Sequence, residues 1–308
     1  MASVQSFLSA SLSRSNRMAS TRRGYLAGAS RRRLARSSSS AQDSGASDYI
    51  LSLQSWFFKP EFGMEDYEIL GRASGVSTLR HDGAPVVLTS LHNVDPAQLP
   101  HYCGSEDSPT AWMHHVKPEE VKCIVQVLNK TGQVLDELPL KKHSMIRHEF
   151  RDLAALEFDD NNLALSFLEK YGLGPIDFEK DKYVQPGPDM KVICFGHRVE
   201  AKLENNQDVS QSFPCIVPGS VAAFEMLPSA CQGGNVMEIP QILVLTESVL
   251  ESGMCGGPVR NEHGQLIGMV EGVLTVELAE ELETPQLAAL IPASELALFT
   301  ASLEAPFV

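Results

Sequence analysis

The chain has 308 residues, of which 43% are hydrophobic, which is enough for a sizeable core or for two closely packed barrels. Its net charge of -14 is unevenly distributed: eight of the 25 basic residues fall within residues 1–40, which contain no acid, so the remainder carries about -22. Such an acidic body argues against binding to nucleic acid or to an anionic membrane, and no apolar stretch is long enough to span a membrane.

Residues 1–40 have the composition of a targeting segment. They are rich in serine, alanine and arginine and lack the apolar centre of a secretory signal. We therefore expect a disordered organellar transit peptide, addressed to the mitochondrion and its matrix, with the chloroplast as the alternative. A solvated basic tail is the other interpretation of the same composition.

Residues 41–64 follow as an N-terminal extension, in which the stretch 48–58 is predicted to form a short helix. From residue 65 onward, short apolar and β-branched runs alternate with turn residues, as is typical of β-strands. The predicted strands of this first half are 73–79, 86–89, 121–128, 133–138 and 153–158, with tight turns at 81–83 and 129–132.

The glycine- and proline-rich residues 172–189 are predicted to connect this half to a second one. Strands then resume at 191–195, 216–224, 241–246, 258–260 and 265–273, and the segment 292–303 has helical spacing. Many short strands with frequent turns predict an all-β fold, either a sandwich or a pair of barrels.

The six cysteines contain no CxxC pair, so a zinc or thioredoxin-type site is not expected. Without a secretory signal the compartment is expected to be reducing, and disulfides are not expected. Most of the cysteines should be small buried apolar residues.

Three short motifs contain residues suited to acyl-transfer chemistry. An apolar strand runs into His92, Asp152 directly precedes another apolar strand, and Cys255 lies among glycines in the stretch 253–258. Each alone has an ordinary structural explanation: a histidine at a strand end, an acid at a turn, a buried cysteine in a glycine turn. Their order along the chain gives them weight together.

Taken together, these motifs resemble the chymotrypsin-like (trypsin-fold) protease superfamily, most closely its HtrA-type members. In that family the histidine ends a Thr-x-x-His motif, as in 89–92, and the acid begins Asp-Leu-Ala-x-Leu, as in 152–156. The nucleophile lies in Gly-x-Ser-Gly-Gly-Pro, as in 253–258 with cysteine in place of serine, a replacement also found in viral 3C-type proteases. The order histidine, acid, nucleophile matches as well.

The resemblance covers residues 65–303 and implies a double six-stranded β-barrel with a C-terminal helix. The expected parts are a first barrel at 65–172, the connection at 172–189, a second barrel at 190–290 and the helix at 292–303. No PDZ domain of the kind that follows HtrA-type protease domains is expected. Met254 replaces the acid that pairs with a new N-terminus in trypsin-type zymogens, so activation by that route is not expected.

The resemblance also implies a hydrolase that cleaves peptide bonds. His92 would be the base, Asp152 would orient it, and Cys255 would be the nucleophile. The backbone N–H groups of Gly253 and Cys255 would form the oxyanion hole, and glycine at 253 would let its N–H turn toward the substrate.

By the same resemblance, Val249 and Leu250 would lie near the base of the substrate pocket. The residues Glu271, Gly272 and Val273 would lie on the strand that pairs with substrate, with Glu271 close to Asp152. An apolar base favours a small or medium apolar side chain at the cleaved position, because a buried cation would lack a partner.

We expect a peptide or protein substrate and no metal or cofactor, and the oligomeric state stays open. Two other functions fit the same residues. One is a catalytically inactive protease fold that binds peptides or partner proteins. The other is a redox-sensitive protein whose exposed thiol at Cys255 is oxidised instead of being used for acyl transfer.

Overall fold

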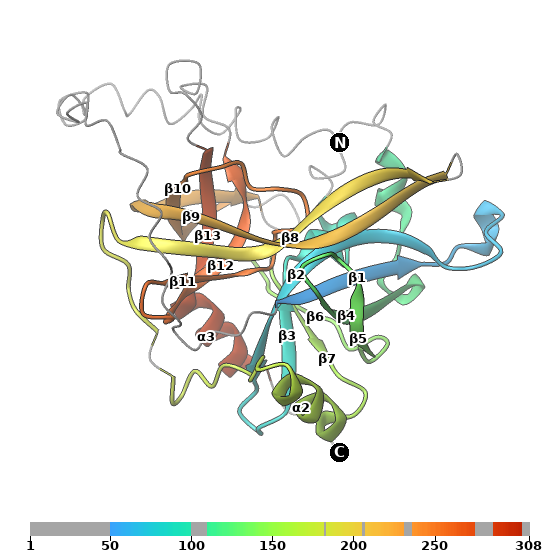
Figure 1. Cartoon of the computed structure of the whole chain (residues 1–308), viewed down its shortest axis with the longest axis horizontal. Helices are drawn as coiled ribbons and strands as arrows, with labels where there is room; N and C mark the ends of the chain where they lie inside the picture. Colours follow the sequence, from blue (N-terminus) through green and yellow to red (C-terminus); the bar gives the residue numbers. More distant parts are fainter. Residues whose placement is uncertain are drawn as a thin grey trace.

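The computed structural model describes residues 50–99, 110–181, 183–204, 207–230, 236–274 and 286–303. The predicted transit peptide at 1–40 lies outside the described residues. Within them the chain forms two antiparallel β-structures side by side, built from strands β1–β7 and β8–β13 (Figure 1). No helix in this part of the chain has the length and apolar character to cross a membrane.

The first half is a sheet with the strand order β5-β4-β1-β2-β3-β7-β6. A bridge between Leu140 and Phe158, together with the Lys141 N–H donating to Glu157 at 2.8 Å, brings the end of β5 against β7. The sheet thereby closes around an apolar core and forms the first barrel. Its strands are β1 (Leu51–Phe57), β2 (Glu68–Leu79), β3 (Pro85–Thr89), β4 (Val121–Leu128), β5 (Val134–Pro139), β6 (Ile146–Arg147) and β7 (Ala154–Glu157).

The short helix predicted at 48–58 is wrong. Residues 51–57 form β1, which pairs with β2 on one side and β4 on the other, so the first barrel begins at Leu51 and not at residue 65. Leu51, Leu53 and Phe57 recur at the two-residue period of a strand and lie in the barrel core. Ser52 and Gln54 alternate with them on the opposite face and are buried as well, so β1 is covered on both sides.

The second half is a closed six-stranded barrel with the order β10-β13-β12-β11-β8-β9. Its strands are β8 (Lys191–Glu204), β9 (Gln207–Ala230), β10 (Val236–Thr246), β11 (Pro258–Asn261), β12 (Leu266–Leu274) and β13 (Gln286–Pro292). Helix α3 (Ala293–Ser302) follows β13. The predicted all-β fold of two barrels with a C-terminal helix is confirmed.

A shared apolar cluster holds the two barrels together. Val76, Leu88 and Leu153 from the first barrel pack with Ile291 of β13 and Leu296 of α3. The cluster lies between the barrels and buries the inner face of α3, so the helix acts as part of the interface.

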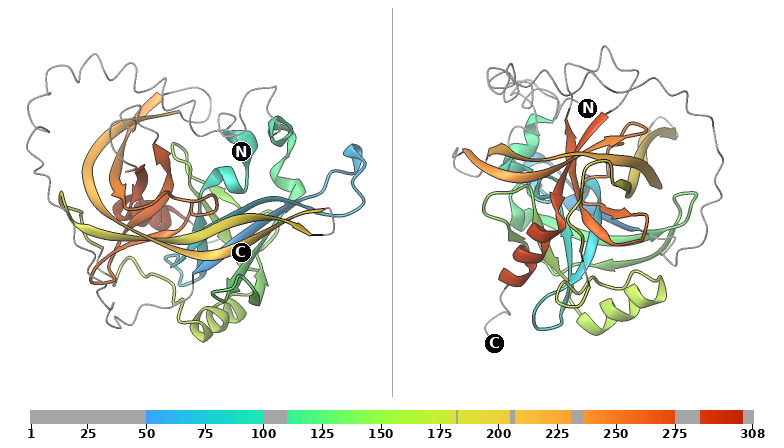
Figure 2. Two further views of the ribbon diagram at one scale, coloured as in Figure 1. Left: turned by 45° about the horizontal axis from the view of Figure 1, so that its top comes forward. Right: turned by 90° about the vertical axis from the view of Figure 1, so that its left-hand side faces the viewer.

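Strands β8 and β9 extend as one long hairpin from the second barrel across the first (Figures 1 and 2). The Arg72 guanidinium of β2 donates to the Ser210 carbonyl at 2.8 Å and to its hydroxyl at 3.0 Å. Gln211 Nε2 donates to the Gly132 carbonyl at 3.2 Å, in the turn between β4 and β5. The hairpin therefore joins the barrels on a second face.

Helix α2 (Asn161–Lys170) was not predicted, although its signals are present in the sequence. The Asp160 carboxylate accepts hydrogen bonds from the N–H groups of Asn162 and Leu163, which is an N-cap. Ala164, Phe167 and Leu168 then recur at helical spacing and pack into the first barrel.

Candidate active site

His92 lies in a single 3-10 turn, Leu91–Asn93, directly after β3. Leu91 is fully buried in the core of the first barrel and anchors this turn. The His92 side chain is 15% exposed, so its ring is largely enclosed but still reaches the surface.

Asp152 reaches His92 because β3 and β7 are neighbours in the sheet. Thr89 pairs with Ala154, so the residues just after β3 and just before β7 meet at one edge. The Asp152 carboxylate accepts the His92 backbone N–H at 2.8 Å and lies 2.5 Å from the ring Nδ1. This double contact fixes the ring orientation and places the Nδ1 proton toward the acid, which leaves Nε2 for another partner.

Cys255 lies in the loop between β10 and β11, on the second barrel, and is half-buried. Its thiol is hydrogen-bonded to His92, which comes from the first barrel. The structure therefore brings together all three residues that the sequence predicted, at the junction of the two barrels.

The His92 imidazole is strongly biased toward its charged form. Burial lowers its pKa, but the charge and hydrogen bond of Asp152, together with those of Cys255, outweigh burial and raise the pKa to about 10. At neutral pH the ring is therefore an imidazolium between a carboxylate and a sulfur.

The other described cysteines have no comparable environment. Burial raises the pKa of the Cys123 and Cys194 thiols to about 12, and burial also raises that of Cys215. Among the described residues, none of the cysteines is in a disulfide. Cys255 is therefore set apart from them by its contact with an imidazole.

The two predicted oxyanion donors belong to peptides whose carbonyls are already bonded. The Ser252 carbonyl accepts the Val199 N–H of β8 at 3.0 Å, and the Met254 carbonyl accepts the Gly257 N–H at 3.0 Å. The N–H and C=O of a trans peptide point in opposite directions, so the N–H groups of Gly253 and Cys255 face away from these bonds. Neither N–H has a backbone acceptor within the part of the chain that the structure describes.

Gly253 adopts a φ of +99°, a conformation that side chains disfavour. A Cβ at this position would also lie 2.8 Å from the His197 carbonyl. Both observations explain why this position requires glycine.

The predicted pocket residues lie in three different environments. Val249 is exposed, whereas Leu250 is buried in the core of the second barrel. Glu271, Gly272 and Val273 lie on β12, where a register shift relative to β13 falls between Val270 and Gly272. A Cβ at Gly272 would meet nothing within 4 Å, so this stretch borders open space.

Glu271 is buried and lies close enough to Asp152 for their charges to interact. Burial raises the pKa of Glu271 and the Asp152 charge raises it further, while Arg151 and a hydrogen bond from Gln241 act in the opposite direction.

Arg151 is a member of this site that the sequence motifs do not identify. Its side chain is fully buried, donates to the Pro240 carbonyl at 2.8 Å and pairs with Glu295 of α3 at 3.2 Å. Its neighbour in the chain is Asp152, and its charge also reaches Glu271. The sequence signal was weak, because a charged pair before a strand is usual at an exposed turn.

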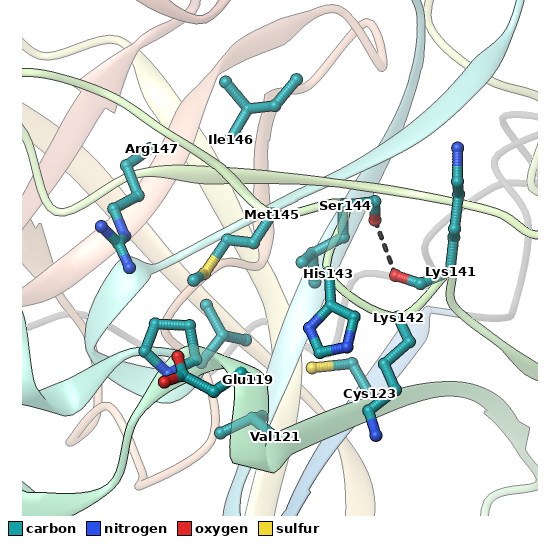
Figure 3. A pocket seen from close by; sticks show the side chains of 13 residues that line it. Glu119, Val121, Cys123, Lys141, Lys142, His143, Ser144, Met145, Ile146 and Arg147 are labelled. Atoms are coloured by element: carbon teal, nitrogen blue, oxygen red, sulfur yellow. Dashed lines mark hydrogen bonds between the residues drawn. The ribbon is translucent and has the colours of Figure 1, made fainter. Parts of the chain in front are cut away.

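A cavity of about 630 Å³ lies elsewhere, at the mouth of the first barrel (Figure 3). Its lining includes Val121 and Cys123 of β4 and the segment 141–147. It contains none of the three predicted triad residues His92, Asp152 and Cys255. It is therefore separate from the candidate active site. Within the described residues, no group of three or more His, Cys, Asp or Glu side chains is placed to hold a metal ion.

Two antiparallel β-barrels with a histidine, an acid and a cysteine at their junction are the arrangement of the chymotrypsin-like class of fold. Residues 73–269 match the family model described as "Trypsin-like peptidase domain". The chain belongs to this family. None of the curated proteins compared with the chain matches it.

Two solved structures are similar to the chain. One is the Rv3671c protease from M. tuberculosis in its active form, at 12% identity and a TM-score of 0.46, covering 83% of each chain. The other is the MamO protease domain from Magnetospirillum magneticum in its apo form, at 16% identity and a TM-score of 0.44, covering 82% of this chain and 96% of that one.

Proposed function

We propose that the protein is a cysteine-type endopeptidase in which His92, Asp152 and Cys255 form the catalytic triad. The single observation that carries this proposal is the hydrogen bond between the Cys255 thiol and an imidazole whose Nδ1 lies 2.5 Å from the Asp152 carboxylate. A thiol that served only for packing would not need a paired imidazole beside it.

In the first half of the proposed reaction, the Cys255 thiolate attacks the carbonyl carbon of the scissile peptide. A C–S bond forms, and the π electrons move onto the carbonyl oxygen, which accepts hydrogen bonds from the N–H groups of Gly253 and Cys255. As the C–N bond breaks, the leaving amine takes a proton from the His92 imidazolium.

In the second half, neutral His92 accepts a proton from water, and the hydroxide so formed attacks the thioester carbonyl. Collapse of this second tetrahedral species breaks the C–S bond and releases the carboxylic acid. The thiolate and the imidazolium are then both restored, and Asp152 holds the ring in one orientation throughout.

The test is covalent labelling of the full chain with a peptide aldehyde or peptide vinyl sulfone that carries a small apolar side chain at the cleaved position. We expect an adduct on Cys255, located by mass spectrometry of proteolytic fragments. Cys255→Ala should remove the adduct, and His92→Ala should slow its formation by about 100-fold or more.

Cys215→Ala is the matched control, since Cys215 is also half-buried but has no imidazole partner among the described residues. This variant should label like the wild type. Equal labelling of the wild type, Cys255→Ala and His92→Ala would contradict the peptidase. Reversible peptide binding without an adduct or turnover would instead favour the inactive peptide-binding fold.

A further inference from the structure

Ser74 of β2 lies on the first barrel and bonds to the glycine-flanked turn of the second. Its backbone N–H donates to the Cys255 carbonyl at 3.0 Å, and its hydroxyl donates to the Gly253 carbonyl at 2.8 Å. We propose that Ser74 is a positioning residue that holds the oxyanion hole in shape, with His197 fixing its hydroxyl. This inference rests on the proposed peptidase function.

The hydrogen bonds of the Ser74 hydroxyl form a complete set. Its single proton goes to the Gly253 carbonyl, and its oxygen accepts the His197 backbone N–H at 3.0 Å. The His197 ring Nδ1 lies 3.1 Å from the same oxygen, so it fills the remaining acceptor position as a donor. With both lone pairs occupied, the hydroxyl proton has one direction left, toward Gly253.

His197 is suited to this fixed role and not to acid–base chemistry. It is 1% exposed, and burial lowers its pKa to about 3, so the ring is neutral at any physiological pH. Within the described residues its Nε2 has no hydrogen-bond partner, which agrees with a neutral ring protonated at Nδ1. The hydroxyl of Ser74 therefore does not change orientation with pH.

Ser74 completes a series of four successive carbonyls, all of which accept hydrogen bonds. Those of residues 252 and 254 bond within the second barrel, to Val199 and Gly257. Those of residues 253 and 255 bond to Ser74. Every peptide from 252 to 256 is thus held by its carbonyl, and no peptide that supplies an oxyanion donor can rotate without breaking one of these bonds.

The first experiment compares Ser74→Ala with Ser77→Ala. Ser77 lies on the same strand and is also buried, but its hydroxyl has no partner among the described residues. We expect Ser74→Ala to lower kcat by about tenfold or more with KM within about twofold, since the lost bonds act on the transition state. Ser77→Ala should retain the wild-type kcat. Ser74→Thr, which keeps the hydroxyl, should recover most of the activity.

Two inhibitors separate this role from general damage to the site. A peptide aldehyde forms a tetrahedral adduct with an oxyanion, so its affinity for Ser74→Ala should fall by the same factor as kcat. Iodoacetamide reacts by displacement at a CH₂ group and develops no oxyanion, so its rate at Cys255 should stay within about twofold of the wild type. Circular dichroism and thermal unfolding report whether each variant is folded.

His197→Leu is the second variant, because it removes the ring contact but keeps the bond from Ser74 to Gly253. It should lower kcat less than Ser74→Ala does. If folded Ser74→Ala kept the wild-type kcat, the proposed role of Ser74 would be overturned. The same holds if this variant lost turnover and iodoacetamide reactivity equally. Neither result would contradict the proposed peptidase function. A wild-type chain that neither turns over peptides nor binds the aldehyde would overturn the proposed function, and this inference with it.

Discussion

At the scale of single residues, two buried charged groups, Arg151 and Glu271, accompany His92, Asp152 and Cys255 in the candidate site. Arg151 is fully buried and pairs with Glu295 of α3, and Glu271 is buried within range of the charges of both Arg151 and Asp152. A carboxyl that is buried beside another carboxylate takes up a proton more readily than one in water.

Glu271→Gln tests this arrangement through stability. The pKa of Glu271 is raised above its ordinary value of 4.5, so the group favours the folded state below that pH, and this contribution is lost as the pH rises through the raised pKa. Glutamine keeps the shape and the neutral state. The free energy of unfolding of Glu271→Gln relative to the wild type should therefore grow as the pH rises above 4.5.

Urea unfolding at several pH values from 4.5 to 8 measures this difference. If this difference in the free energy of unfolding stayed constant, or shrank as the pH rose, Glu271 would ionise in the folded protein at no cost in stability.

At the scale of elements, contacts between hairpins of different barrels decide how the two halves fit. The turn between β4 and β5 meets β9 at Gly132, where φ is +77° and a Cβ would lie 2.5 Å from the Ser212 carbonyl. Gly83, in the turn between β2 and β3, has nearly the same φ of +81° but nothing within 4 Å of its Cβ position.

Gly132→Ala and Gly83→Ala form a matched pair. Both should lose about 1–2 kcal/mol of stability from the left-handed backbone conformation. Gly132→Ala should lose about 1–3 kcal/mol more, because the new methyl group forces the turn away from β9. Thermal and urea unfolding measure both, and equal losses would show that the β4–β5 turn and β9 do not pack as described.

The sequence predicted most strands of both barrels, because their apolar runs are bounded by clear turn residues. It did not predict β1, because the alternation of residues 51–54 is short and runs into the apolar residues 56–58. It did not predict α2 either, although Asp160 and the apolar residues after it have the spacing of a capped helix. His92, Asp152 and Cys255 were predicted from the motifs that contain them. Ser74 and His197 were not, because nothing in a strand pattern separates a buried serine with three hydrogen-bond partners from one with none.

At the scale of the whole molecule, an acidic two-barrel body follows an arginine-rich segment without acids. We propose that residues 1–40 direct the protein to the mitochondrion, on the strength of that composition alone. A fluorescent protein carrying residues 1–40 should enter mitochondria, and replacing the eight arginines with glutamine should abolish import. Fluorescence microscopy checks both, and plastid or cytosolic fluorescence of the unmodified fusion would contradict the proposal.

Met254 is fully buried in the core of the second barrel, directly before Cys255. Apolar packing at this position needs no charged partner, so Met254 ties the loop around Cys255 to the barrel core without an ion pair. For the proposed endopeptidase, we therefore expect no activation through an ion pair with an N-terminus newly made by cleavage.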